Sequence, residues 1–141
     1  MDGNLNRELV IIGGGPAGLM AAESALANGA SNVSVYERMG SVARKFLIAG
    51  KGGLNLTHSE PMPQFIQRYL PQTRSIGHWL REFGPDAVRA WAAGLGVETF
   101  VGSSGRVFPH DLKAAPLLRA WVRRLRANGL QPLGRCQQHA G

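Results

Sequence analysis

The chain has 141 residues, of which 44% are hydrophobic, so it can form one domain with a sizeable core and its composition excludes a disordered protein. No apolar run reaches the roughly 18 residues of a membrane span, and a single cysteine excludes an intramolecular disulfide and suits a cytoplasmic protein. The net charge of +7 raises the question of nucleic acid, but the basic residues are scattered, and a basic excess also suits a protein that binds an anionic cofactor.

An apolar, largely β-branched run at residues 9–12 predicts a strand that is buried on both faces of a parallel sheet. Gly13, Gly15 and Gly18 follow it and match the pattern G-x-G-x-x-G. In this pattern the first glycine allows a tight turn, the second lets the backbone approach a pyrophosphate, and the third lets a helix pack against the strand. Pro16 marks the start of that helix, where its missing N–H costs nothing.

The predicted helix ends at Asn28-Gly29, and the free N–H groups and positive dipole at its start attract an anion. A second predicted strand, residues 32–37, ends in Glu37. This acid follows the glycines by about 20 residues, the separation at which a carboxylate accepts hydrogen bonds from the adenosine ribose. We therefore expect a dinucleotide site; the alternative is a glycine-rich turn with a solvated Glu37.

A basic pair, an apolar tetrapeptide and a glycine-rich loop follow the second strand. Arg44 and Lys45 are near enough in sequence to Glu37 to reach the same nucleotide. Gly50, Gly52 and Gly53 would let the backbone pass close to a flat ligand. An ordinary flexible turn explains these residues equally well.

The remaining segments predict further helices and one hairpin. Aromatic and aliphatic residues on the predicted helices are expected in the core, and the arginines of the last helix are interpreted as a solvated face, with a phosphate-binding stripe as the alternative. The tail after Gly129 shows no clear pattern. The expected elements are a short helical turn within residues 61–71, a helix at 75–83 with Ile76, Trp79, Leu80 and Phe83 on its buried face, a helix starting at Pro85 and closing at Gly94 and Gly96, a β-hairpin near 97–108, and a helix at 114–127 that carries Arg119, Arg123, Arg124 and Arg126.

No residue can be assigned as a catalytic acid, base or nucleophile from the sequence. His58 and His110 stand beside polar turns without neighbours at metal-ligand spacing, so we expect surface histidines and no metal site. Cys136 has no partner and lies in the tail. Any redox chemistry must therefore belong to a cofactor.

Three blocks of the sequence resemble the N-terminal part of the bacterial NAD(P)/FAD-dependent oxidoreductases that include aminoacetone-oxidase-like and bile-acid-dehydroxylation-type flavoproteins. They are residues 10–37 with GGGPAGL, residues 44–57 with RKFLIAGKGGLNLT, and residues 105–118 with GRVFPHDLKAAPLL. The first block is common to many flavoproteins, whereas the second and third are specific to this family.

The resemblance implies FAD as the cofactor, a small-molecule substrate, and NAD(P)H as an electron donor; NAD itself is the alternative occupant of the fingerprint. It places the diphosphate at the glycine turn, the ribose at Glu37, and the flavin near residues 50–55. The scattered basic residues and the lack of a long apolar run predict no nucleic-acid or membrane partner. The expected cofactor-binding residues are Gly13, Gly15, Pro16, Ala17, Gly18, Glu37, Arg38, Arg44, Lys45, Gly50, Gly52 and Asn55.

The chain departs from this family at two points. Gly53 and Leu54 stand where much of the family has arginine and cysteine, so no thiol can act beside the flavin. Family members are also much longer, with a substrate domain and a returning segment that completes the FAD site. We therefore expect residues 1–141 to be one α/β, Rossmann-like FAD-binding domain with an incomplete parallel sheet, ending where the next strand should begin. A non-catalytic nucleotide-binding module or a truncated inactive product is the alternative.

Overall fold

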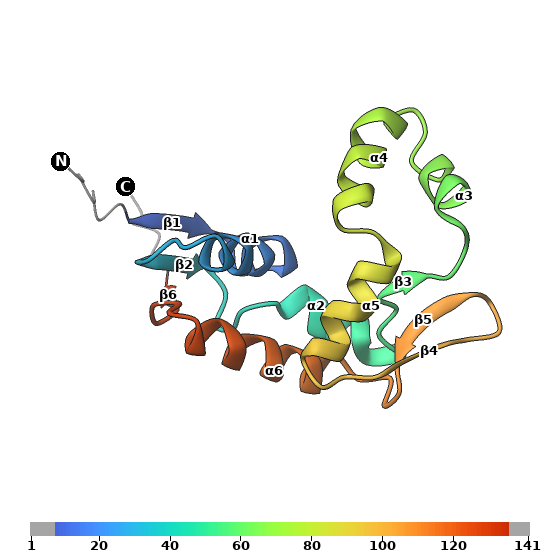
Figure 1. Ribbon diagram of the computed structural model, residues 1–141. Coiled ribbons are helices and arrows are strands. Elements are labelled where there is room, and N and C mark those ends of the chain that lie inside the picture. Colours follow the sequence, from blue (N-terminus) through green and yellow to red (C-terminus); the bar gives the residue numbers. More distant parts are fainter. Residues whose placement is uncertain (1–7, 136–141) are drawn as a thin grey trace, which may run out of the picture. The chain divides into compact units, whose positions relative to one another are not determined.

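The computed structural model describes residues 8–135, which form two compact units (Figure 1). The first unit runs to Ile48 and resumes at Leu118, and the second unit is Ala49–Leu117. Each unit contains one small sheet with its own helices. No helix in the described part of the chain is long and apolar enough to cross a membrane.

A parallel sheet forms the centre of the first unit. Its strands are β1 (Leu9–Ile12), β2 (Val33–Glu37) and β6 (Gly134–Arg135), in the order β1-β2-β6. The helix α1 (Pro16–Ala27) connects β1 to β2. This order is one half of a doubly wound dinucleotide-binding sheet, so the predicted α/β, Rossmann-like fold with a parallel sheet is confirmed.

Helix α1 begins and ends where the sequence predicts. Gly15 is its N-cap and Pro16 occupies its first turn. Leu19 and Ala22 are fully buried on one face. Beyond its last residue, Gly29 adopts a φ of +86°, a left-handed conformation that favours glycine and ends helices.

The core of the first unit lies between β2, α1 and the helix α6 (Ala114–Ala127). Val33 and Val35 of β2 are completely buried, and Trp121 of α6 is 2% exposed. The indole N–H of Trp121 donates a 2.6 Å hydrogen bond to Glu23 of α1. A buried indole with a satisfied N–H supplies a large apolar contact without an unpaired donor, so α6 is anchored to α1.

Strand β1 is not buried on both faces, and that prediction is wrong. Ile12 is 71% exposed, Val10 45% and Leu9 40%. In the described chain β1 pairs with β2 on one side only. In a complete doubly wound sheet the first strand is central and has a neighbour on each side. The apolar sequence of β1 is thus that of a central strand, although β1 is an edge strand here.

The segment after Gly129, which shows no pattern in the sequence, supplies the third strand. Leu130 is 6% exposed and forms an isolated parallel bridge with Val33. Gly134 then pairs with Tyr36. The expectation that the chain ends where the next strand should begin is therefore wrong, because that strand begins at Gly134. A strand of two described residues is too short to produce a periodic pattern.

A short helix was not predicted after β2. Arg44–Ala49 form α2, which has no buried residues, and Gly50–Gly52 continue it as a 3₁₀ turn. A helix of six residues makes fewer than two turns and gives little periodicity to detect.

The second unit is built on an antiparallel sheet. Its strands are β3 (Thr57–His58), β4 (Thr99–Val101) and β5 (Arg106–Pro109), in the order β3-β5-β4. The predicted hairpin is confirmed as β4 and β5. Val107 on the central strand β5 is completely buried.

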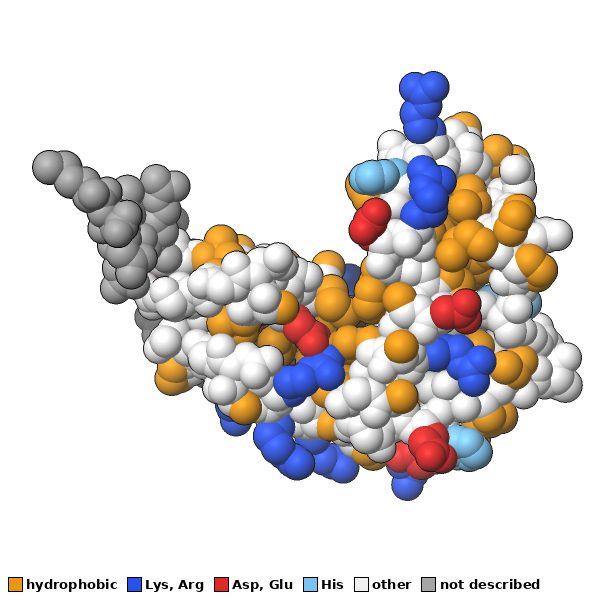
Figure 2. Space-filling view, in the orientation of Figure 1, with side chains coloured by type: hydrophobic (Ala, Val, Ile, Leu, Met, Phe, Trp, Pro, Cys, Tyr) orange, Lys and Arg blue, Asp and Glu red, His pale blue; other side chains and the backbone are white. Residues whose placement is uncertain are grey.

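Three helices complete the second unit: α3 (Met62–Gln67), α4 (Thr73–Glu82) and α5 (Pro85–Gly94). Helix α4 buries Gly77, where an added Cβ would lie 3.5 Å from Ile66 of α3. The prediction of a buried aromatic face on α4 is wrong, because Trp79 is 62% and Phe83 40% exposed. Figure 2 shows exposed hydrophobic side chains over this region. Helix α4 thus packs on α3 through the side that carries Gly77, while Trp79, two residues further along, lies on the other side of the helix.

Candidate functional site

The turn between β1 and α1 has the backbone geometry that the three glycines predict. Gly13 has a φ of +101°, and its N–H donates to the carbonyl of Tyr36 at 2.8 Å. A Cβ on Gly18 would lie 1.9 Å from the carbonyl oxygen of Gly13. Real Cβ atoms do not approach that closely, so the helix can pack this tightly on the strand end only with glycine at position 18.

Gly15 differs from its neighbours because nothing lies within 4 Å of a Cβ built on it. Its φ of −77° is accessible to any residue. The space in front of it adjoins the first turn of α1, where Pro16 and Ala17 are exposed. No side chain caps α1, and its first turn has no acid. The free N–H groups and the positive helix dipole therefore remain available to an anion.

Glu37 at the end of β2 is bonded directly to the glycine turn. Its Oε2 accepts a 2.8 Å hydrogen bond from the Gly14 N–H, and its Oε1 accepts one of 2.8 Å from the Met39 N–H. The Met39 bond, followed by the Gly14 bond and the neighbouring Arg38, lowers the pKa of the Glu37 carboxyl. A carboxylate has about four acceptor positions, so this anion is fixed in place and retains capacity for hydroxyl donors.

A cavity of about 150 Å³ opens beside Glu37. It combines the end of β2 with the segment that leads into β6, which the sequence did not associate with the site. Gly134 packs against Tyr36, since an added Cβ would lie 2.5 Å from the Tyr36 ring, but the sequence alone gives no sign of this contact. The lining residues are Glu37, Met39, Gly40, Ser41, Val42, Leu133 and Gly134.

The basic pair is attached to the glycine turn through the residue before it. Ala43 is buried, and its N–H donates to the Gly14 carbonyl at 2.7 Å. Arg44 and Lys45 follow in the first turn of α2 with exposed side chains, and Arg38 is also exposed. The structure thus connects this predicted part of the site to the turn by a direct backbone bond, while the three basic side chains reach into solvent.

The other predicted site residues lie in the second unit. A Cβ on Gly50 would lie 2.5 Å from the Cβ of Ala114, so packing within this unit already requires a glycine there. Gly52 has open space around it, and Asn55 is exposed. Asn55 lines a cavity of about 320 Å³ whose other lining residues are Leu56, Thr57, His58, Phe65, Arg68, Tyr69 and Arg106.

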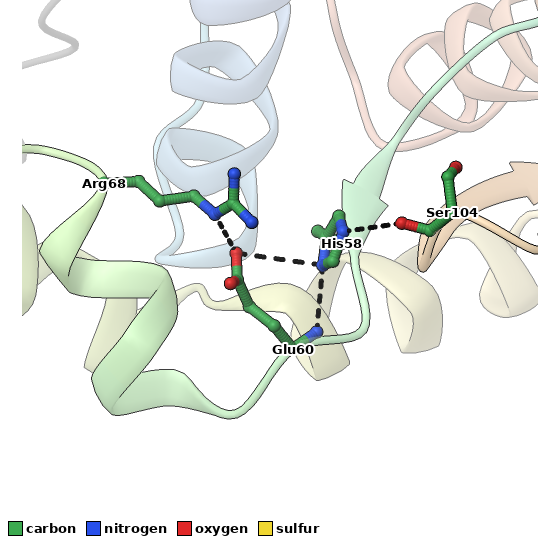
Figure 3. Close-up of polar contacts among 4 residues, drawn as sticks. All are labelled: His58, Glu60, Arg68 and Ser104. Carbon is green, nitrogen blue, oxygen red and sulfur yellow. Dashed lines mark hydrogen bonds and ion pairs between the residues drawn. The ribbon is translucent and has the colours of Figure 1, made fainter.

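A polar network not predicted from the sequence borders this cavity (Figure 3). His58 contacts the Ser104 carbonyl through Nε2 at 3.0 Å, and its Nδ1 accepts the Glu60 N–H at 3.1 Å. Because Nδ1 accepts, Nε2 carries the proton and donates. The Glu60 carboxylate also pairs with Arg68. His58 is therefore a bonded residue that joins β3 to the β4–β5 turn, and not merely a surface histidine.

Among residues 8–135, no group of histidine, cysteine and acidic side chains could hold a metal.

The parallel half-sheet and its connecting helix α1 define a Rossmann-like domain. The chain belongs to the family described as the HI0933-like protein Rossmann domain, whose model matches residues 7–139. This is the FAD-binding oxidoreductase family that the three sequence blocks indicated. The match includes the tail after Gly129, so the expectation that the tail departs from the family is wrong.

The chain is similar to parts of two longer proteins. It is 30% identical over 118 residues to the 3-dehydro-bile acid delta(4,6)-reductase of Clostridium scindens, covering 82% of this chain and 28% of that protein. Its fold is similar to the crystal structure of THI4 from Thermovibrio ammonificans, with a TM-score of 0.52 and 19% identity over 91% of this chain and 38% of that one. The chain therefore spans well under half the length of either protein.

Proposed function

We propose that this chain binds FAD as part of a flavin-dependent oxidoreductase, with the diphosphate at the glycine turn and the adenosine ribose at Glu37. The observation that carries this proposal is the open space beside Gly15. Neither the backbone conformation nor the packing at this position requires a glycine. That space lies at the uncapped start of α1. Glu37, bonded to Gly14, provides an oriented acceptor beside it. Together they suit a ligand with an anionic centre and a neighbouring diol.

Each part of the first unit then has a role in binding. The N–H groups of Gly15, Ala17 and Gly18 would donate to the diphosphate, while Gly13 and Pro16 shape the turn. The cavity beside Glu37 would hold the adenosine. The guanidinium and ammonium groups of Arg38, Arg44 and Lys45 would balance the charge of the diphosphate.

Gly50, Gly52 and Asn55 of the second unit are the residues that the family resemblance implies for the flavin. Gly52 is open and Asn55 is exposed beside a cavity, as contacts with a flat ring require; Gly50 would contribute backbone only. When bound, FAD supplies the hydride or electron transfer, and NAD(P)H is the proposed electron donor. The protein binds and orients the cofactor. Substrate chemistry such as that of the bile-acid reductase would further require the parts of a longer protein that this chain does not cover.

Gly15→Val tests the diphosphate position. The extended conformation of Gly15 accepts valine, so the fold should survive while the side chain fills the phosphate space. We expect FAD affinity, measured by quenching of flavin fluorescence, to fall at least about 100-fold, which corresponds to the loss of one or two hydrogen bonds to a charged group. Ala21→Val, at an exposed position on the same helix, is the control. Unchanged FAD binding by the Gly15 variant would show that the site is misplaced.

Competition between nucleotides tests the role of Glu37. Its carboxylate should repel a 2'-phosphate and accept bonds from a free ribose. We expect NAD to displace FAD more effectively than NADP, and Glu37→Gln to reduce that difference. A preference for NADP in the unmodified chain would contradict this role, with Arg38 as the residue able to neutralise the phosphate.

A further inference from the structure

The first unit contains a second, larger cavity, which the proposed FAD site does not explain. It is a groove of about 440 Å³ between α6 and the segment that leads into α2. Its apolar floor is formed by Val42, Leu47, Leu118 and Val122, and Ser41 lies at one end. Cavities of this size accommodate small organic ligands. The groove lies entirely within the first unit.

Three arginines of α6 form the rim of the groove. Arg119, Arg123 and Arg126 all line it, and all three are exposed. They follow one another at i, i+4 and i+7, so they project from one side of the helix, and like charges at this spacing destabilise a helix. Figure 2 shows basic side chains gathered along this helix.

The positive charge of this rim is not balanced by the described residues. Arg124, the neighbouring arginine on α6, pairs with Glu23 of α1. None of the ion pairs within residues 8–135 involves Arg119, Arg123 or Arg126. The groove lining itself contains no acid. A bound anion would therefore relieve the repulsion among the three guanidinium groups.

We propose that this groove binds an amphipathic organic anion. The apolar part of the ligand would cover Leu47, Leu118 and Val122, while a carboxylate, sulfate or phosphate head would contact the arginines. The ligand should have an apolar body because the floor of the groove is apolar, and covering that apolar surface is favourable. A simple solvated face, the interpretation drawn from the sequence, does not account for an apolar floor between two elements. A polyanion such as nucleic acid would leave that floor unused.

The adenosine cavity shares Ser41 and Val42 with this groove, so the test must separate the two sites. Decanoate serves as the probe and 1-decanol as its uncharged counterpart. Titration calorimetry of the full chain at low salt should show decanoate binding that is stronger than decanol binding and persists in saturating FAD. Displacement of decanoate by FAD would assign the groove to the nucleotide site and overturn the proposal.

The triple variant R119Q/R123Q/R126Q identifies the anion-binding groups. We expect it to weaken decanoate binding at least about tenfold, since each exposed charge pair contributes modestly, and to leave decanol binding unchanged. R74Q/R81Q/K113Q removes the same charge from exposed positions in the second unit and is the matched control. Circular dichroism establishes that both variants fold. Equal loss in the two variants, or binding of a single-stranded oligonucleotide in place of decanoate, would refute the proposal.

Discussion

Gly15 of the first unit differs from two glycines of the second unit in the space around it. In the first unit the space beside Gly15 is open, although its φ of −77° does not require glycine. In the second unit a Cβ on Gly84 would lie 2.5 Å from the Leu80 carbonyl oxygen, and one on Gly105 would lie 2.6 Å from the His58 ring. These glycines serve packing, whereas Gly15 leaves open space. A glycine that neither conformation nor packing accounts for is therefore a candidate for ligand binding.

Gly18→Val should have the largest effect on stability. Its side chain would collide with the Gly13 carbonyl, which belongs to rigid backbone. We expect the free energy of unfolding, measured by urea denaturation, to fall by more than about 3 kcal/mol. Gly15→Val should change it by less than about 1 kcal/mol because the space is empty. Similar losses for both variants would remove the distinction between packing and binding glycines within one turn.

Gly105→Ala should have an intermediate effect. This residue combines a φ of +80° with contact to the His58 ring. We expect a loss of about 1 to 3 kcal/mol in unfolding free energy from strain and displacement of the histidine. Gly52→Ala, at an open position, should cost less than about 0.5 kcal/mol in the same denaturation experiment. A neutral Gly105→Ala substitution would mean that the turn and His58 adjust freely.

Glu37 should make the stability of the first unit depend on pH. Hydrogen bonds from Met39 and Gly14 lower its folded pKa below the ordinary value of 4.5. Its contribution is therefore fully present above pH 4.5 and is lost as the pH falls through the folded pKa. Between pH 7 and pH 3, the urea midpoint of the unmodified chain should decrease more than that of Glu37→Gln. Glu82→Gln, which alters an exposed acid on α4, should behave like the unmodified chain.

Ile12→Lys should have the smallest effect on stability. Ile12 is 71% exposed on the edge strand β1, so we expect less than about 0.5 kcal/mol change in unfolding free energy. The charge should instead reduce association through the open edge, which sedimentation at increasing concentration would measure. The contrasting substitution, Val107→Lys on the central strand β5, should unfold the second unit. A large stability loss at Ile12 would show that β1 is covered in solution.

The sequence predicted the elements that neighbouring residues determine. It missed the features that depend on contacts between residues far apart in the chain. The turn at Gly13 to Gly18 follows from backbone sterics, and the helix ends at Asn28 and Asn128 follow from the glycines beside them. The exposure of Ile12 and Trp79 could not be predicted, because burial depends on which elements cover a face. The bonds of His58 to Ser104 and of Glu37 to Gly14 also escaped, since they join residues that are far apart in the chain.

The strand β6 has a consequence for the order in which this protein can fold as the ribosome makes it. Strand β2 is synthesised early, but its partner Gly134 and the helix that carries Trp121 come late, and Trp121 bonds to Glu23 across a separation of 98 residues. The second unit ends at Leu117, within the first turn of that helix, so it is complete before Trp121 emerges. During synthesis the half-sheet of β1 and β2 must therefore wait with one edge unpaired, a state in which exposed strands are prone to misassociation. A nascent chain would acquire its glycine turn early and its stable support only after Gly134 has been made.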